Sequence, residues 1–171
     1  MFEFIKEYAE IITAISSVFI ALLALSFSIW QGKKQVKHNK LSVMPHLDII
    51  SFHDSESHIM FFRVDNNGVG PAIIDVIRIT INENSLGGYT HESYGKFFTE
   101  NGFPRVKYKL EFVSPMKGHF LEPGSKTELF KITPTTFDTN DTLQFFNFFK
   151  SVKIFIEYHS VYNQKFSEST I

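Results

Sequence analysis

The chain contains no cysteine among its 171 residues, so disulfide bonds and thiolate metal sites are excluded. It also lacks the short catalytic signatures: there is no HExxH, no GxSxG and no P-loop. None of the seven histidines forms a close ligand pair with an acidic residue at metal spacing. We therefore expect a protein that is not an enzyme and that holds neither a metal nor another cofactor.

Charge is absent from one long stretch of the chain. Residues 11–30, IITAISSVFIALLALSFSIW, carry none, and a helix of this length spans about 30 Å, the thickness of the hydrocarbon core of a bilayer. A cleaved signal peptide is disfavoured because the start is acidic, with Glu3, Glu7 and Glu10. A buried helix of a soluble protein rarely reaches this length without a charge. We interpret residues 11–30 as an uncleaved transmembrane helix that ends at Trp30, an interfacial residue type.

The two flanks of this span differ in charge. Four lysines follow it in GKKQVKHNK, and a single lysine precedes it. Lysine-rich flanks stay in the cytoplasm, so we expect a single-pass protein with a cytoplasmic C-terminal domain and a short non-cytosolic N-terminus. The basic run is either a simple stop-transfer flank or a segment that also touches anionic lipid.

Small residues recur at helical spacing along one face of the span. They are Ala14, Ser17, Ala21, Ala24 and Ser28. Such a face lets helices approach closely in lipid, so we expect a homo-oligomer. Two alternatives remain, a chance recurrence of common residues and a narrow polar path through the oligomer.

The remainder of the chain is predicted to be rich in β-strands. The fold class expected is one N-terminal transmembrane α-helix plus a mainly β cytosolic domain, a sandwich or small barrel, with one or two short helices. The expected strands are 46–53, 58–65, 72–82, 105–113, 127–133, 152–162 and 165–170. Residues 139–150 are expected to be helical, and residues 88–100 are ambiguous. The expected boundaries are 1–10 for the N-terminus, 11–30 for the span, 31–40 for a basic juxtamembrane linker and 41–171 for the β-rich domain.

The charge of this domain argues against nucleic acid as a partner. Residues 41–171 hold twelve lysines and arginines against fifteen aspartates and glutamates, a net charge of −3. A binder of duplex nucleic acid is expected to be basic. The domain is therefore predicted not to bind a duplex.

Four basic residues are candidates for binding a small anion. Arg63 and Arg78 each interrupt an apolar run, so each needs either a carboxylate, such as Asp65 or Asp75, or an anionic ligand. Strand alternation also places Arg105 and Lys107 on one face of the run RVKYKLEF, together with Lys109. Side chains on one face of a strand are about 6.6 Å apart, close to the spacing of phosphates in a nucleic-acid strand. The alternative is the solvated face of an amphipathic strand.

The stretch NNGVGPA, residues 66–72, resembles a phosphate-binding loop at first sight. A dinucleotide fingerprint needs a third glycine and a following helix, but Ile73 occupies that position and a strand pattern follows. Pro71 also removes a backbone donor. We interpret the stretch as a connection between two strands, with Asn66-Asn67-Gly68 in a left-handed or tight turn.

The order of features resembles a known set of proteins. A single span, a basic flank, SVMPHL at 42–47 and NNGVGPAIIDVIRI at 66–79 are similar to small bacterial single-span proteins with a cytosolic β-rich domain. The architecture also resembles membrane effectors of type III CRISPR antiviral defence. The resemblance implies location in the bacterial inner membrane and a cytosolic domain that senses cyclic oligoadenylate, a cyclic oligonucleotide. It also implies an oligomeric transmembrane segment as the output, with Arg63, Arg78, Arg105 and Lys107 as the basic candidates.

Two other functions are compatible with the sequence. A membrane-tethered protein–protein interaction module is the first, with FFNFFK at 145–150 as an exposed apolar patch. The second is a hydrolase without a recognisable motif.

Overall fold

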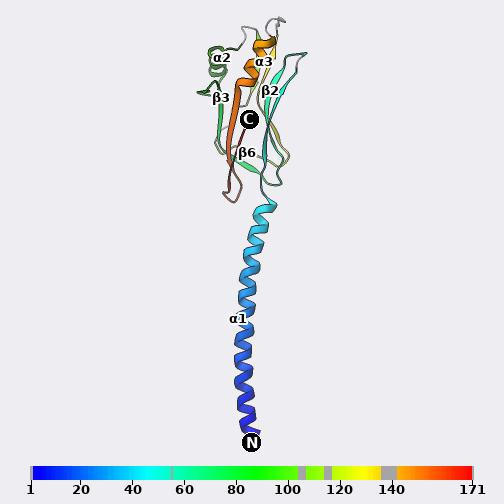
Figure 1. Ribbon diagram of the computed structural model, residues 1–171, viewed down its shortest axis with the longest axis vertical. Coiled ribbons are helices and arrows are strands. Elements are labelled where there is room, and N and C mark those ends of the chain that lie inside the picture. The colour runs from blue at the N-terminus through cyan, green and yellow to red at the C-terminus, as the bar shows by residue number, and fades with distance from the viewer. Residues whose placement is uncertain (1, 55, 104–106, 114–116, 136–141, 171) are drawn as a thin grey trace. The chain divides into compact units, whose positions relative to one another are not determined.

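The computed structural model describes residues 2–54, 56–103, 107–113, 117–135 and 142–170 (Figure 1). The chain forms two compact units, Met1–Ser42 and Val43–Ile171. We describe each unit by itself.

The first unit is one helix, α1 (Phe2–Ser42), drawn in blue and cyan in Figure 1. It has 41 residues and is therefore about 62 Å long. The helix is long and apolar enough to cross a membrane, as the sequence predicts. It does not stop at Trp30 but continues through the basic residues 31–40. Pro45 follows shortly after its end, which is where a proline is tolerated.

Two antiparallel sheets form the second unit. The strands of sheet A, in spatial order, are β1 (Leu47–His53), β2 (Met60–Asn66), β7 (Lys126–Pro134) and β5 (Tyr108–Phe112). The strands of sheet B, in spatial order, are β4 (Asn84–Ser85), β3 (Ala72–Ile81), β8 (Val152–His159) and β9 (Lys165–Ser169), with β6 (Phe120–Leu121) paired to β3. Two short helices accompany the sheets: α2 (His91–Glu100) and α3 (Thr142–Ser151). The predicted fold class is confirmed.

One core lies between the two sheets. Alternate residues point into it, as in β8, where Ile154, Ile156 and Tyr158 are buried and the residues between them are more exposed. Phe62 of sheet A and Ile79 of sheet B belong to the same buried cluster, so the sheets pack face to face as a sandwich. Among the described residues, seven of the 20 phenylalanines are buried in this core, which explains part of their abundance.

Both helices contribute aromatic side chains to the core. Residues 88–100, ambiguous in the sequence, contain α2, whose N-cap Thr90 accepts a hydrogen bond from the Ser93 N–H at 3.1 Å. On α3, Phe145 and Phe148 are buried. The expectation that FFNFFK forms an exposed apolar patch is therefore wrong for these two residues. Phe146 is the more exposed member, at 38%, and the Lys150 ammonium lies 4.3 Å from its ring centre.

Candidate functional site

Arg63 points outward from sheet A and has a carboxylate partner. Its Nε and Nη2 donate to the two oxygens of Asp65 at 2.6 and 2.9 Å. The Asp65 side chain is 9% exposed, so the pair neutralises a carboxylate that is largely removed from water. Of the two explanations that the sequence left open for Arg63, the structure shows the ion pair.

Arg78 is placed differently. It is exposed on the outer face of sheet B, and its guanidinium lies 5.5 Å from the centre of the Phe155 ring on the neighbouring strand. It forms no ion pair with any residue in the described part of the chain. Asp75, the carboxylate considered for it, is bonded to His159 instead. The guanidinium of Arg78 therefore remains available to a ligand, with an aromatic ring beside it.

Of the remaining two candidates, the structure describes Lys107. Lys107 directly precedes β5 of sheet A, and its carbonyl accepts hydrogen bonds from the Thr135 N–H and hydroxyl at 2.7 and 3.0 Å. Arg105 lies outside the described residues. Because Arg63 and Arg78 point outward from opposite sheets, the structure does not bring the sequence-predicted residues to one place.

The outer face of sheet B contains a hollow whose lining includes Val76, two residues before Arg78 on β3. Its volume is about 710 Å³. The charged and polar residues that line it include Asp75, Lys117, Glu157, His159, Asn163 and Lys165. We call it the sheet B hollow. Its volume falls within the range of small-molecule sites.

A β-bulge accounts for the position of this hollow. In the pairing of β3 with β8, Ile74 lies opposite Tyr158 and Val76 opposite Glu157, so Asp75 is the extra residue. A bulge re-aims the side chain that it carries. The Asp75 carboxylate thereby reaches Nδ1 of His159 at 2.9 Å. The contact orients the imidazole at the edge of the hollow.

Charges of both signs line the hollow, with Lys117 and Lys165 facing Asp75 and Glu157. Lys165 lies opposite His159 in the pairing of β8 with β9, and Lys117 joins it from the segment before β6. Neither lysine forms an ion pair with another described residue. Phe155 lies two residues before Glu157 on β8, about 6.6 Å along the same face. The face thus offers cationic groups and an aromatic ring that can stack on a base.

Little in the sequence indicates this arrangement. Alternation predicts that His159 and Glu157 point to the same side of a strand. It does not predict the bulge at Asp75, because an inserted residue has no side-chain pattern of its own. Within the described residues, no three His, Asp or Glu side chains are grouped as a metal site would require.

The NNGVGPA stretch forms backbone hydrogen bonds with the segment that precedes β1. Residues 67–71 connect β2 to β3, which confirms the predicted connection. Asn67 N–H donates to the carbonyl of His46 at 2.8 Å, and Val69 N–H donates to that of Met44 at 3.1 Å. The loop is therefore bonded through its backbone to residues 43–46, which follow α1 in the chain.

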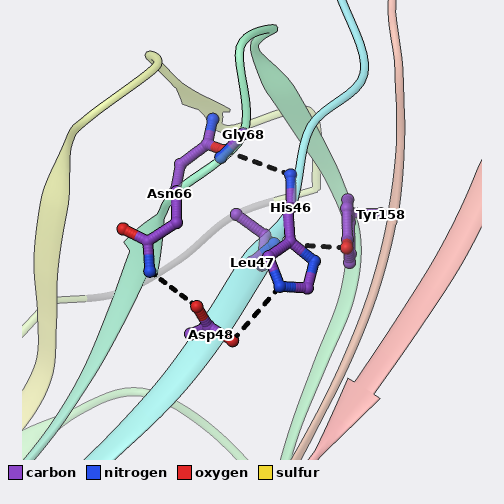
Figure 2. A network of polar contacts seen from close by, with 7 residues as sticks. His46, Leu47, Asp48, Asn66, Gly68 and Tyr158 are labelled. Carbon is purple, nitrogen blue, oxygen red and sulfur yellow. Dashed lines mark hydrogen bonds and ion pairs between the residues drawn. The ribbon is translucent and has the colours of Figure 1, made fainter. Parts of the chain in front are cut away.

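Asn66 organises this contact from inside the protein (Figure 2). Its side chain is fully buried. Its amide donates to the carbonyls of Gly70 and Leu121 at 2.9 and 3.0 Å, and its oxygen accepts from the Gly68 N–H at 3.1 Å. The His46 N–H also lies 3.4 Å from this oxygen. One buried amide thus satisfies groups from three separate segments.

The two glycines of the loop are required by close packing. A Cβ at Gly70 would collide with the backbone of Val43, and one at Gly68 with the backbone of His46 and Met44. Neither glycine has a positive φ, nor does Asn66 or Asn67. The explanation by a left-handed turn is therefore wrong, and the reason for glycine is the approach of a second backbone.

One residue, Tyr158, borders the hollow and also contacts the start of β1. The hydroxyl oxygen of Tyr158 accepts a hydrogen bond from the Leu47 N–H at 3.2 Å, as Figure 2 shows. Tyr158 lines the hollow between Glu157 and His159. Burial raises the pKa of its phenol, so the group is neutral at physiological pH. The hollow and the entry to β1 are thus separated by one tyrosine.

The comparisons with known proteins are sparse. No curated protein matches the chain. Among solved structures, the archaellum periplasmic stator protein FlaG from Sulfolobus acidocaldarius is similar at 11% identity, over 74% of this chain and 100% of its own, with a TM-score of 0.28. No inference about function follows from a likeness this weak. A family model described as a domain of unknown function, DUF8453, matches residues 9–171. The chain therefore belongs to the DUF8453 family.

Proposed function

We propose that this protein is a non-enzymatic, membrane-anchored effector of prokaryotic antiviral defence. Its β-sandwich binds a cyclic oligoadenylate on the outer face of sheet B and transmits the binding to an oligomeric transmembrane segment. The observation that carries the proposal is the combination of Arg78, His159 and Lys165 with the half-buried Phe155 ring on a hollowed face. The choice of a cyclic oligoadenylate rests on the resemblance of the architecture.

The chemistry of the face suits such a ligand. Phosphodiesters need cationic donors, and purine bases need an aromatic surface and amide groups. Lys117 and Lys165 supply charge, Phe155 supplies the aromatic ring, and Asn163 supplies an amide at the edge of the hollow. Glu157 and Asp75, which contacts His159, oppose an anion there, so binding is centred on Lys165, opposite His159 on β9.

Transmission follows the contact of Tyr158 with Leu47. A ligand that shifts β8 at Glu157 and His159 also shifts the tyrosine between them, because strand backbones move as units. The phenol then changes the position of the Leu47 N–H, to which it is bonded at 3.2 Å. Residues 43–46, held by the 67–71 loop, carry the change toward the end of α1 in the sequence.

The anchor in this proposal is α1. It crosses the bacterial inner membrane once, with the lysines after Trp30 and the sandwich on the cytoplasmic side. A reporter enzyme fused to the C-terminus is expected to be active in the cytoplasm. Activity in the periplasm would reverse the orientation and remove the ligand proposal with it.

Self-association uses the small residues of α1. Ala14, Ala21 and Ala24 leave room for a second backbone, together with Ser17 and Ser28. The Ser17 hydroxyl donates to the carbonyl of Thr13 at 2.7 Å. Its polar group is therefore satisfied within its own helix, which favours close packing over a water-filled path.

Calorimetry tests the ligand directly. Full-length protein in lipid nanodiscs is titrated with cyclic tri-, tetra- and hexa-adenylate, and binding of one of them at micromolar concentration is expected. Linear oligoadenylates of the same length are the control for generic attraction to anions. Absence of binding by all three cyclic forms would remove the proposal.

A second function has its own supporting observation. Ile50 and Phe52 are 37% and 47% exposed on the edge strand β1, and the Phe52 ring stacks on Phe61 at 4.9 Å. An apolar surface on an edge strand suits a protein partner. A pull-down with the full-length protein that recovers a stoichiometric partner, and loses it with Phe52→Ser, would favour a membrane-tethered interaction module.

A further inference from the structure

The lysines that follow the apolar span all lie on one side of α1. At about 100° per residue, Lys33, Lys37 and Lys40 fall with Lys34 and Trp30 within an arc of about 120°. We call this arc the lysine face. The small residues of the span, and Gln31 and Gln35 beyond it, lie on the other side of the helix. The positive charge is therefore segregated and not spread around the helix.

The lysine face has no compensating charge on its own helix. The nearest acidic residue on α1 is Glu10, 23 positions before Lys33, which is about 35 Å away at 1.5 Å per residue. Screening already removes most of an interaction over that distance in ordinary salt. The charge must be balanced by something outside α1.

Distances along the helix place these lysines at the depth of lipid headgroups. If Trp30 marks the end of the hydrocarbon core, Lys33 and Lys34 lie about 5 to 6 Å beyond it, and Lys37 about 10 Å. The headgroup layer on each side of a bilayer is about 5 to 8 Å thick. Two of the lysines thus lie within this layer, and the third is within reach of it through its flexible side chain.

The direction of the side chains supports the same depth. Side chains on a helix lean toward its N-terminus, which for α1 means back toward the apolar span. Lys34 shows this directly, because its ammonium lies 5.4 Å from the centre of the Trp30 ring, four residues earlier. The indole and the ammonium together provide a flat apolar surface and a cation side by side.

We propose that the lysine face binds the headgroups of anionic phospholipids in the leaflet where α1 ends, with Lys33, Lys34 and Lys37 on the phosphate and Trp30 beside the glycerol. The site belongs to α1 alone and is independent of any ligand on the sandwich. It rests on the part of the proposed function in which α1 crosses a bilayer. Segregation of the lysines also keeps them away from the small-residue face, so a packed helix pair leaves the lipid site open.

The only tryptophan of the chain reports on this site. Full-length protein is reconstituted into vesicles of phosphatidylcholine and phosphatidylglycerol, with one of the two lipids brominated on its acyl chain near the headgroup. Bromine quenches indole fluorescence by contact, so the two series give the relative occupancy of each lipid beside Trp30. We expect phosphatidylglycerol to be preferred about fivefold or more, since each lysine near an anionic surface contributes about that factor. The preference should fall in high salt.

Two variants distinguish a lipid site on the lysine face from general attraction between a basic protein and an anionic membrane. Lys33→Gln, Lys34→Gln and Lys37→Gln together should bring the two lipids to near equality, whereas Lys96→Gln on α2 should change nothing. A second variant keeps the total charge and moves it, combining Lys34→Gln and Lys37→Gln with Gln31→Lys and Gln35→Lys. It should lose most of the preference reported by Trp30.

Three outcomes would overturn the lipid site. Equal quenching by both lipids in the unaltered protein would show that the lysine face selects no headgroup. An unchanged preference in the relocated-charge variant would show that only net charge matters. Absence of quenching by either lipid would place Trp30 outside the bilayer, and it would overturn the membrane anchor together with the site. The first two outcomes leave the anchor and the sandwich ligand untouched.

Discussion

Tyr158 and Leu47 are 111 positions apart in the sequence and are joined by one hydrogen bond, from the Leu47 N–H to the phenolic oxygen at 3.2 Å. The bond crosses the core from sheet B to the first residue of sheet A. Tyr158 is 1% exposed, so water cannot replace the tyrosine as the acceptor. The start of β1 is therefore fixed by a residue that also lines the sheet B hollow.

Removal of that oxygen should weaken the sandwich. Tyr158→Phe keeps the ring, which stacks on Phe166 at 5.4 Å, but leaves the Leu47 N–H buried without an acceptor. We expect a loss of about 1 to 3 kcal/mol in the free energy of unfolding. Urea denaturation measures it. Tyr162→Phe, at an exposed tyrosine, is the matched control and should be neutral. An unaltered stability in Tyr158→Phe would show that the bond contributes nothing.

The second prediction concerns Asn66. The change to aspartate keeps the shape but removes both donors and buries a negative charge near the carbonyls of Gly70 and Leu121. We expect a destabilisation of at least about 3 kcal/mol. Asn147→Asp, at an exposed amide on α3, should change stability by less than about 0.5 kcal/mol. Equal effects of the two variants in thermal unfolding would contradict the role assigned to Asn66.

The third prediction concerns Gly70. Its replacement by alanine places a methyl group against the backbone of Val43, which cannot rotate away as a side chain can. The free energy of unfolding should fall by about 3 kcal/mol or more, which is the upper end of the range for overpacked residues. At Gly87, by contrast, no atom lies within 4 Å of the position that a methyl group would occupy. Gly87→Ala should therefore be tolerated, and a comparable loss at both glycines would refute the close approach as the cause.

Substitutions of Arg78 and Arg63 should have different effects, the first on ligand affinity and the second on stability. Arg78→Gln and Lys165→Gln should each weaken the binding of a cyclic oligoadenylate by about tenfold or more, the usual cost of a lost charge-assisted contact. Arg63→Gln should leave the affinity unchanged and instead destabilise the sandwich, because Asp65 loses its partner. Calorimetry and urea denaturation on the same three proteins give both quantities. The reverse pattern, with affinity lost only at Arg63, would move the site to sheet A.

A pH effect is expected from Tyr94. This residue is fully buried on α2, and its hydroxyl has no hydrogen-bond partner within the described residues. Burial raises the pKa of the phenol above its ordinary value of 10.0. The folded state keeps the phenol neutral, whereas in the unfolded chain it ionises near pH 10. The free energy of unfolding is therefore unaffected by this group below pH 10 and falls progressively above it.

Tyr94→Phe tests this sign. The variant should be as stable as the unaltered protein at pH 7, or slightly more so, because no hydrogen bond is lost. Above pH 10 its stability should fall less steeply, by up to about 1.4 kcal/mol per pH unit. Burial also raises the pKa values of the buried Tyr158 and of the partly buried Tyr89 and Tyr108, so part of the alkaline loss should remain. An identical pH profile in the variant would exclude Tyr94 as a contributor.

Periodicity predicted most of the elements. In β8, apolar and polar residues alternate, and this pattern predicts both the strand and the face of it that is buried. The structure confirms both, with the strand in the interior of sheet B. The long apolar run likewise predicts the membrane-spanning part of α1. The helix continues beyond it through residues 31–40, where the sequence has no apolar pattern. A local sequence pattern predicts an element well when each face of that element has the same surroundings, core, solvent or lipid, along its whole length.

The candidate site was harder to predict, because it depends on contacts between distant segments. Arg63 looked unusual in an apolar strand, and the reason is an ion pair two residues away in the sequence. Arg78 looked the same, but it stands exposed beside Phe155. The turn that brings Lys165 opposite His159 lies between two strands that the sequence predicts, 152–162 and 165–170, but the bulge at Asp75 has no signature in composition. Sequence reasoning therefore found one residue of the face and missed its neighbours.

The backbone contacts of the 67–71 loop also decide where a water-soluble fragment can begin. Val43 and Met44 precede the first strand, yet they fill the space that Gly68 and Gly70 leave open. A fragment that starts at Leu47 would expose this groove and leave the N–H groups of Val69 and Gly70 without acceptors. Cleavage between Ser42 and Val43 removes α1 and keeps every one of these contacts, which makes that peptide bond the natural limit for expression of the sandwich alone.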